Sequence, residues 1–95
     1  MTTRKEYIEK LKARIDLWNA KIAEAEARFG EVEADAKLAR KEELQEMRAM
    51  RDEAKEKLNE VQSASEDAWQ DMKGGVRAAW NSLESAFETA SHRFD

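Results

Sequence analysis

The sequence contains no cysteine and no proline, and it has only three glycines and one histidine. Without cysteine there is no disulfide framework, no thiolate zinc site and no cysteine nucleophile. The residues that usually form turns are scarce. No uncharged apolar run approaches the roughly 18 residues that span a bilayer, and no segment resembles a signal peptide. These absences lead us to expect a protein of the cytoplasm built from long regular elements.

What is present favours helix. Charged residues make up 40% of the chain, hydrophobic residues 41%, and the net charge is −4. Such a composition, rich in Ala, Glu, Lys, Arg and Leu, is typical of long helices and coiled coils. No segment shows the alternation and β-branched enrichment of a strand. No segment is basic enough to neutralise a row of phosphates, so we expect no nucleic-acid partner. The sequence predicts one all-α domain over residues 1–95.

The last third of the chain has an eleven-residue repeat. Trp69 aligns with Trp80, and Val76 aligns with Phe87. Eleven residues make three helical turns, so the repeat keeps one apolar stripe on a single helix over residues 65–93. Because the register holds on both sides of Gly74-Gly75, we expect the helix to continue through them. We also expect Gly75 to allow another backbone to approach closely.

The first sixty residues carry an apolar heptad that predicts a helix over residues 3–62. Thr3 and Glu6 have the spacing of an N-terminal capping box, and Ser63 to Glu66 has the same spacing at the boundary with the second helix. Gly30 is either the residue that ends a helix at Phe29 or a glycine tolerated inside a longer one. The heptad keeps its phase across Gly30, which favours one continuous helix.

The two predicted lengths suggest an assembly. A helix over residues 3–62 is about 90 Å long, and one over 65–93 is about 43 Å long. The short helix, folded back antiparallel, covers only half of the long one. A second antiparallel copy covers the remainder, which predicts a homodimer with a four-helix layer. The alternative is a break near Gly30 that gives a monomeric three-helix bundle.

The apolar side chains of these stripes are our candidates for the core and for self-association. They are Ile8, Leu11, Ile15, Trp18, Ile22, Phe29, Leu44, Met47, Leu58, Val61, Trp69, Met72, Val76, Trp80, Leu83 and Phe87.

Several segments resemble a known family. WQDMKGGV (69–76) and AWNSL (79–83), preceded by EYIEKL (6–11) and WNA (18–20), are similar to small bacterial coiled-coil proteins. Members of that family are either uncharacterised or described as stress-response proteins. The resemblance implies a helical accessory protein connected with stress, and it implies no catalytic residue.

Potential chemical groups are few. His92 has Glu88 and Asp95 nearby on one helix face, but a metal site needs more convergent ligands and supporting hydrogen bonds. Adjacent acids such as Glu42 and Glu43 are expected on a solvated helix face rather than in a catalytic pocket. No nucleophile motif or phosphate-binding loop is present. We therefore expect no enzyme activity, no metal and no cofactor.

The three tryptophans suggest two modes of action. Trp18, Trp69 and Trp80 lie on the apolar stripes, where packing in a core or a dimer is the simplest role. The leading hypothesis is a non-enzymatic, self-associating protein that acts through protein–protein contacts. The alternative is a membrane-surface protein that uses the apolar face of residues 68–94, although that segment has few of the basic residues such helices carry.

Overall fold

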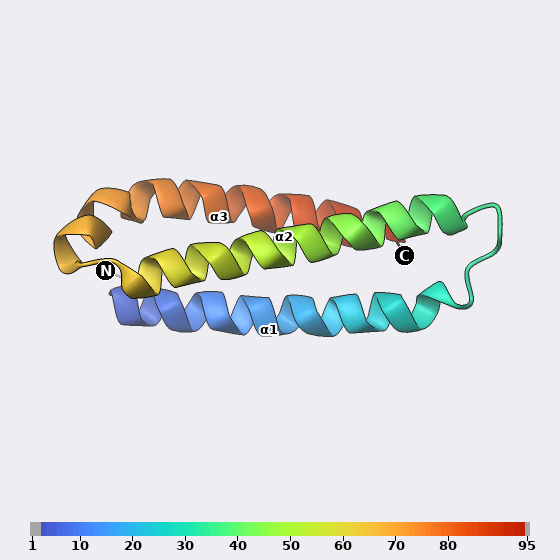
Figure 1. The fold of residues 1–95 in the computed structure, drawn as a ribbon, viewed down its shortest axis with the longest axis horizontal. Helices are drawn as coiled ribbons and strands as arrows, with labels where there is room; N and C mark the ends of the chain where they lie inside the picture. The colour runs from blue at the N-terminus through green and yellow to red at the C-terminus, as the bar shows by residue number, and fades with distance from the viewer. Residues whose placement is uncertain (1–2, 95) are drawn as a thin grey trace.

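The chain folds into three helices in a computed structural model that describes residues 3–94. They are α1 (Arg4–Phe29), α2 (Lys37–Ser63) and α3 (Glu66–Phe94). Consecutive helices run antiparallel, so α1 and α3 point in the same direction (Figure 1). The bundle measures 52 × 20 × 18 Å. Within residues 3–94 there is no strand, and the prediction of an all-α chain is confirmed.

Side-chain caps fix where α1 and α3 begin. Thr3 Oγ1 accepts a hydrogen bond from the Glu6 amide at 3.2 Å, as the capping prediction requires. At the start of α3 the cap is Ser65, whose Oγ accepts from the Ala68 amide at 3.1 Å. Ser63 is instead the last residue of α2 and donates its hydroxyl to the Asn59 carbonyl at 2.8 Å. The predicted cap at Ser63 is therefore wrong by two residues, because α2 runs one residue further than expected.

The predicted continuous helix over residues 3–62 is wrong. Residues 30–36 form a loop with two short turns, closed by hydrogen bonds from Glu31 N to Arg28 O and from Ala36 N to Glu33 O. The helical seam is weakest here, since it offers only Val32 and small alanines for burial. Folding back lets α1 bury its apolar side against the rest of its own chain. The observed architecture is the predicted alternative, a three-helix bundle with a break near Gly30.

The predicted apolar residues form one core inside the single chain. Twelve of them are buried: Leu11, Ile15, Trp18, Ile22, Leu44, Met47, Val61, Trp69, Val76, Trp80, Leu83 and Phe87. Four are partly buried against that core: Ile8, Phe29, Leu58 and Met72. Trp18 is 3% exposed and Trp80 is 1% exposed. The expectation that a second copy is needed to cover these apolar residues is therefore wrong. Dimer formation itself stays a prediction.

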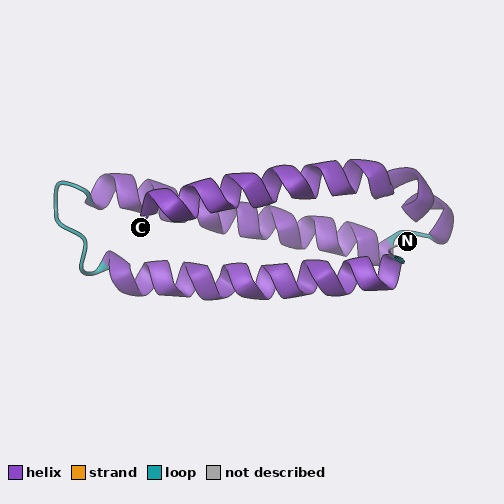
Figure 2. Ribbon diagram, turned by 180° about the vertical axis from the view of Figure 1, so that it is seen from behind, coloured by secondary structure: helices purple, strands orange, loops and turns teal. Residues whose placement is uncertain are grey.

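The three helices do not pack equally. α2 lies closely along both α1 and α3, whereas α1 and α3 approach each other at few points. Figure 2 looks onto this α1–α3 face, with α2 behind it. Large aromatic side chains bridge the wider gap. Trp18 lies between Trp80 and Phe87, with ring centroids 5.2 and 4.5 Å away and planes within 6° of parallel. Nearer the N-terminus, the rings of Tyr7 and Trp69 are 5.7 Å apart.

The paired glycines of α3 do not serve close packing. The helix runs unbroken through Gly74 and Gly75, which confirms that part of the prediction. A Cβ added at either glycine would meet nothing within 4 Å. Within the single chain no other backbone approaches Gly75, because this side of α3 faces open space.

Candidate functional site

The α1–α3 face has two adjoining hollows at its N-terminal end. They share Tyr7 and Arg77, and together we call them the Tyr7 groove. The first, of about 500 Å³, is also lined by Trp69, Gln70, Asp71, Lys73 and Gly74. The second, of about 250 Å³, is also lined by Lys10, Trp80 and Asn81. The groove exists because α1 and α3 are held apart by aromatic rings and because Gly74 contributes no side chain.

Tyr7 is the unusual residue of this groove. It is only 5% exposed, and its hydroxyl is buried without a hydrogen-bond partner among residues 3–94. Burial raises the pKa of the phenol, the positive charge of Arg77 works against that rise, and the negative charge of Glu84 adds to it. At neutral pH the phenol is therefore uncharged and carries a proton that it can donate.

The polar groups around Tyr7 are mainly hydrogen-bond donors. Lys10, Lys73 and Arg77 contribute three positive charges against the single carboxylate of Asp71. Glu84 is already engaged, because it accepts from Trp80 Nε1 at 2.8 Å and lies 3.4 Å from Arg14 Nε. The groove thus combines a buried neutral donor with an excess of positive charge, which suits an anionic acceptor.

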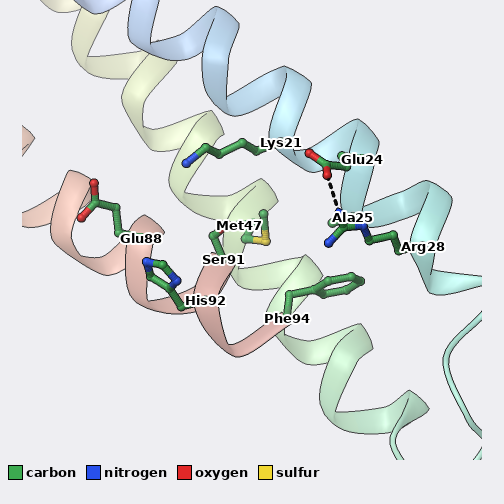
Figure 3. Close-up of a pocket in the computed structure, with 9 residues that line it drawn as sticks. All are labelled: Lys21, Glu24, Ala25, Arg28, Met47, Glu88, Ser91, His92 and Phe94. Atoms are coloured by element: carbon green, nitrogen blue, oxygen red, sulfur yellow. Dashed lines mark hydrogen bonds and ion pairs between the residues drawn. The ribbon is translucent and has the colours of Figure 1, made fainter.

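A third hollow, which we call the C-terminal hollow, lies at the C-terminal end of the same face (Figure 3). Side chains from all three helices meet there, with Met47 of α2 between the other two helices. Its charges are of both signs, and Arg28 pairs with Glu24 at 2.7 Å. Met47 is 1% exposed and so belongs to the core.

His92 and Ser91 line the C-terminal hollow together with Glu88. Consecutive residues on a helix diverge by about 100°, which directs the Ser91 and His92 side chains apart. Within residues 3–94, no three His, Cys, Asp or Glu side chains gather as a metal site. Asp95, the other predicted neighbour of His92, lies outside the described residues.

A fourth hollow lies at the loop end of the α1–α2 hairpin. This end of the hairpin extends beyond the end of α3 (Figures 1 and 2). We call it the loop-end groove. Leu38, the most prominent of its apolar side chains, is 70% exposed. Lys37 Nζ lies 5.5 Å from the Phe29 ring centroid, and Arg48 pairs with Glu26 at 3.1 Å. The groove is lined by Phe29, Ala34, Lys37, Leu38, Lys41, Leu44 and Arg48.

Sequence reasoning placed Ile8 in the α1 seam and overlooked Tyr7. In the structure Tyr7 is buried and Ile8 only partly so. The spacing Tyr7–Leu11–Ile15 follows the i, i+4 rule and was the available signal. The apolar residues of α3 that could have faced a membrane are likewise turned into the bundle, including Trp69, Trp80 and Phe87.

Comparison of the chain with protein families, curated proteins and solved structures found no match. None of the helices within residues 3–94 has both the length and the apolar character needed to cross a bilayer. We therefore infer function from the geometry of the described residues.

Proposed function

We propose that this chain is a non-enzymatic cytoplasmic protein that acts through protein–protein contacts and self-associates by exchanging α1 between two copies. In such an exchange the 30–36 loop straightens into helix, and α1 and α2 become one long helix. The α1 of each copy then packs on α2 and α3 of the other. Every contact of the bundle core is kept, because the same residues meet in the same way.

The 30–36 loop carries this proposal. Gly30 has φ −62° and ψ −23°, and Ala36 has φ −100° and ψ −9°, so both ends of the loop already lie in or near the helical region. Among the described residues none has a positive φ. The chain has no proline, and its heptad is in phase across Gly30. A continuous helix therefore requires changes in the backbone torsions between these two ends, over residues 31–35.

The loop-end groove adds a contact that only the exchanged dimer makes. In an antiparallel pair of long helices, the two straightened loops lie beside each other near the two-fold axis. Leu38 and Phe29 flank that segment, and Leu38 is largely exposed in the single chain. Covering this apolar surface with the second copy would favour the dimer by the hydrophobic effect. The occupant we propose for the groove is therefore the same region of a second copy.

The membrane alternative is less well supported by the geometry. The apolar face of residues 68–94 is the inner face of α3, with Phe87 fully buried and Trp80 1% exposed. A bilayer could reach these side chains only after α3 had separated from α1 and α2. The role in stress responses that the family resemblance implies belongs to our proposal as well, and a stress-sensitive growth defect on deleting the gene would support it.

Two substitutions in the loop test the exchange. Gly30→Ala adds a Cβ that meets nothing within 4 Å. In the dimer, residue 30 changes from a helix end to a helix interior, where glycine costs about 1 kcal/mol relative to alanine, so the dimer fraction should rise. Ala34→Pro occupies the second position of the Glu33–Ala36 turn, where proline is favoured, and it prevents a continuous helix. That variant should stay monomeric. Light scattering after refolding at high concentration distinguishes one chain of 11.0 kDa from two.

Gly75→Ala is the matched control. It makes the same chemical change in open space on α3, far from the loop, and should stabilise the fold without altering the mass. If wild type, Gly30→Ala and Ala34→Pro all give the same mixture of masses, exchange through this loop is excluded.

A further inference from the structure

We propose that the Tyr7 groove is a binding site for an oxyanion, the carboxylate or phosphate group of a small ligand. The inference goes beyond self-association, since it concerns a different end of the bundle and a different chemistry. It starts from the buried hydroxyl of Tyr7, which has no hydrogen-bond partner among residues 3–94.

A buried hydroxyl without a partner is costly. Leaving such a group unsatisfied destabilises a fold by about 1–3 kcal/mol. Phenylalanine at position 7 would keep the ring contact with Trp69, 5.7 Å between centroids, without burying the oxygen. Packing alone therefore does not require the hydroxyl, whereas an acceptor bound in the groove would satisfy it.

Charge selects the kind of acceptor. Arg77 lines both hollows of the groove, and its charge acts on the Tyr7 phenol. No ion pair is recorded for Arg77 among the described residues, whereas Arg14 on the same face pairs with Glu84. Lys10 and Lys73 flank the groove from α1 and α3. Once the flexible side chains that cover the buried hydroxyl move aside, an oxyanion could accept from the phenol with one oxygen and face the Arg77 guanidinium with another.

Shape sets the size of the ligand. The larger hollow measures about 500 Å³, within the range of small-molecule sites. Trp69 supplies an apolar wall, and Gly74 leaves its side of the hollow open. The groove can therefore hold an anionic group together with a modest apolar portion.

The test uses isotope-labelled full-length protein and amide NMR shifts. Acetate and inorganic phosphate are titrated separately, with chloride at matched ionic strength as the reference. We expect saturable shifts at Tyr7, Gly74 and Arg77 with at least one of the two anions. The tighter of the two identifies the ligand as a carboxylate or as a phosphate ester.

Substitutions test which side chains of the groove contact the bound anion. Arg77→Gln should weaken binding about tenfold, because a charge-assisted hydrogen bond is lost. Tyr7→Phe should also weaken it while the helical circular dichroism stays unchanged. Arg93→Gln removes the same charge from an exposed position at the far end of α3 and should have no effect. Equal shifts with chloride, or binding that Arg77→Gln leaves unchanged, would overturn the proposal, as would failure of both anions to bind.

Discussion

Trp18 is the residue on which the packing of α1 against α3 depends most. Its ring lies between Trp80 and Phe87, two α3 residues that are two helical turns apart. The stacked rings fill the gap between two helices that otherwise touch little. The Trp18 stack thus helps to set how far apart α1 and α3 lie, together with the ring contact between Tyr7 and Trp69.

Replacing Trp18 with alanine should lower the free energy of unfolding by about 3–5 kcal/mol, because the change removes stacked contacts and leaves a large cavity. Urea denaturation followed by circular dichroism measures the loss. Leu17→Ala, at the neighbouring position, is the control; Leu17 is 44% exposed, and its truncation should cost less than about 1 kcal/mol. Similar losses for the two variants would contradict the packing described for Trp18.

The burial of the Tyr7 phenol predicts that the fold loses stability at alkaline pH. Its pKa is raised in the folded state by burial, so it ionises above the ordinary value of 10.0. Linkage gives the direction of the effect. The contribution of the neutral, buried Tyr7 phenol to the free energy of unfolding is complete below the pKa of tyrosine in the unfolded chain, and it is lost as pH rises through the pKa of Tyr7 in the folded protein. Because Tyr7 is the only tyrosine, absorbance at 295 nm follows it alone.

We expect tyrosinate to form above pH 10, accompanied by loss of stability, and we expect Tyr7→Phe to retain more stability than wild type in that range. A titration at or below pH 10 in the folded protein would show that the hydroxyl is not buried.

At the residue scale the sequence predicts the core well and the groove poorly. Leu11, Ile15 and Trp18 are buried as the heptad indicates. Tyr7 and Ile8 are adjacent and both apolar, so the pattern alone leaves the choice between them to a slight rotation of the helix. That rotation depends on the position of Trp69, which lies 62 residues away along the chain, and local periodicity carries no information about it.

Ser65 is the clearest case at the scale of the single element. The turn between α2 and α3 is short, and Ser65 Oγ satisfies the Ala68 amide at the start of α3. Ser65→Ala should therefore destabilise the protein by about 1 kcal/mol. Ser63→Ala removes a hydroxyl that bonds back to the Asn59 carbonyl within α2, and it should change stability by less than about 0.5 kcal/mol.

Thermal unfolding of the two serine variants under identical conditions provides the comparison. A larger loss of stability for Ser63→Ala than for Ser65→Ala would contradict the structure and would indicate that Ser63 is the cap, as the sequence predicted.

The break between α1 and α2 shows what local sequence does not determine. Gly30 is compatible with both a helix end and a helix interior, and its observed φ of −62° needs no special residue. Glu33 and Asp35 precede α2, where negative charge favours a helix N-terminus. These local preferences amount to at most about 1 kcal/mol each, which is small beside the burial of the apolar face of α1, and that burial is available in either form. The heptad shows that this face is covered but not whether the cover is the same chain or a second copy.

At the scale of the whole molecule, the observed bundle and the proposed exchanged dimer would use the same core. The chain reaches 52 Å as a bundle, whereas one straightened helix over residues 3–62 would be about 90 Å long. Because the contacts are shared, the balance between the two forms depends on the 30–36 loop and on protein concentration. Our account holds that a single chain is already self-sufficient and that exchange is a second, concentration-dependent state.

Small-angle X-ray scattering of freshly purified wild-type protein at low micromolar concentration tests that account most directly. We predict a mass of one chain, 11.0 kDa, a radius of gyration close to the 15.4 Å of the Cα trace and a longest dimension near 52 Å. A particle of twice that mass and about 90 Å in length, persisting on further dilution, would contradict it.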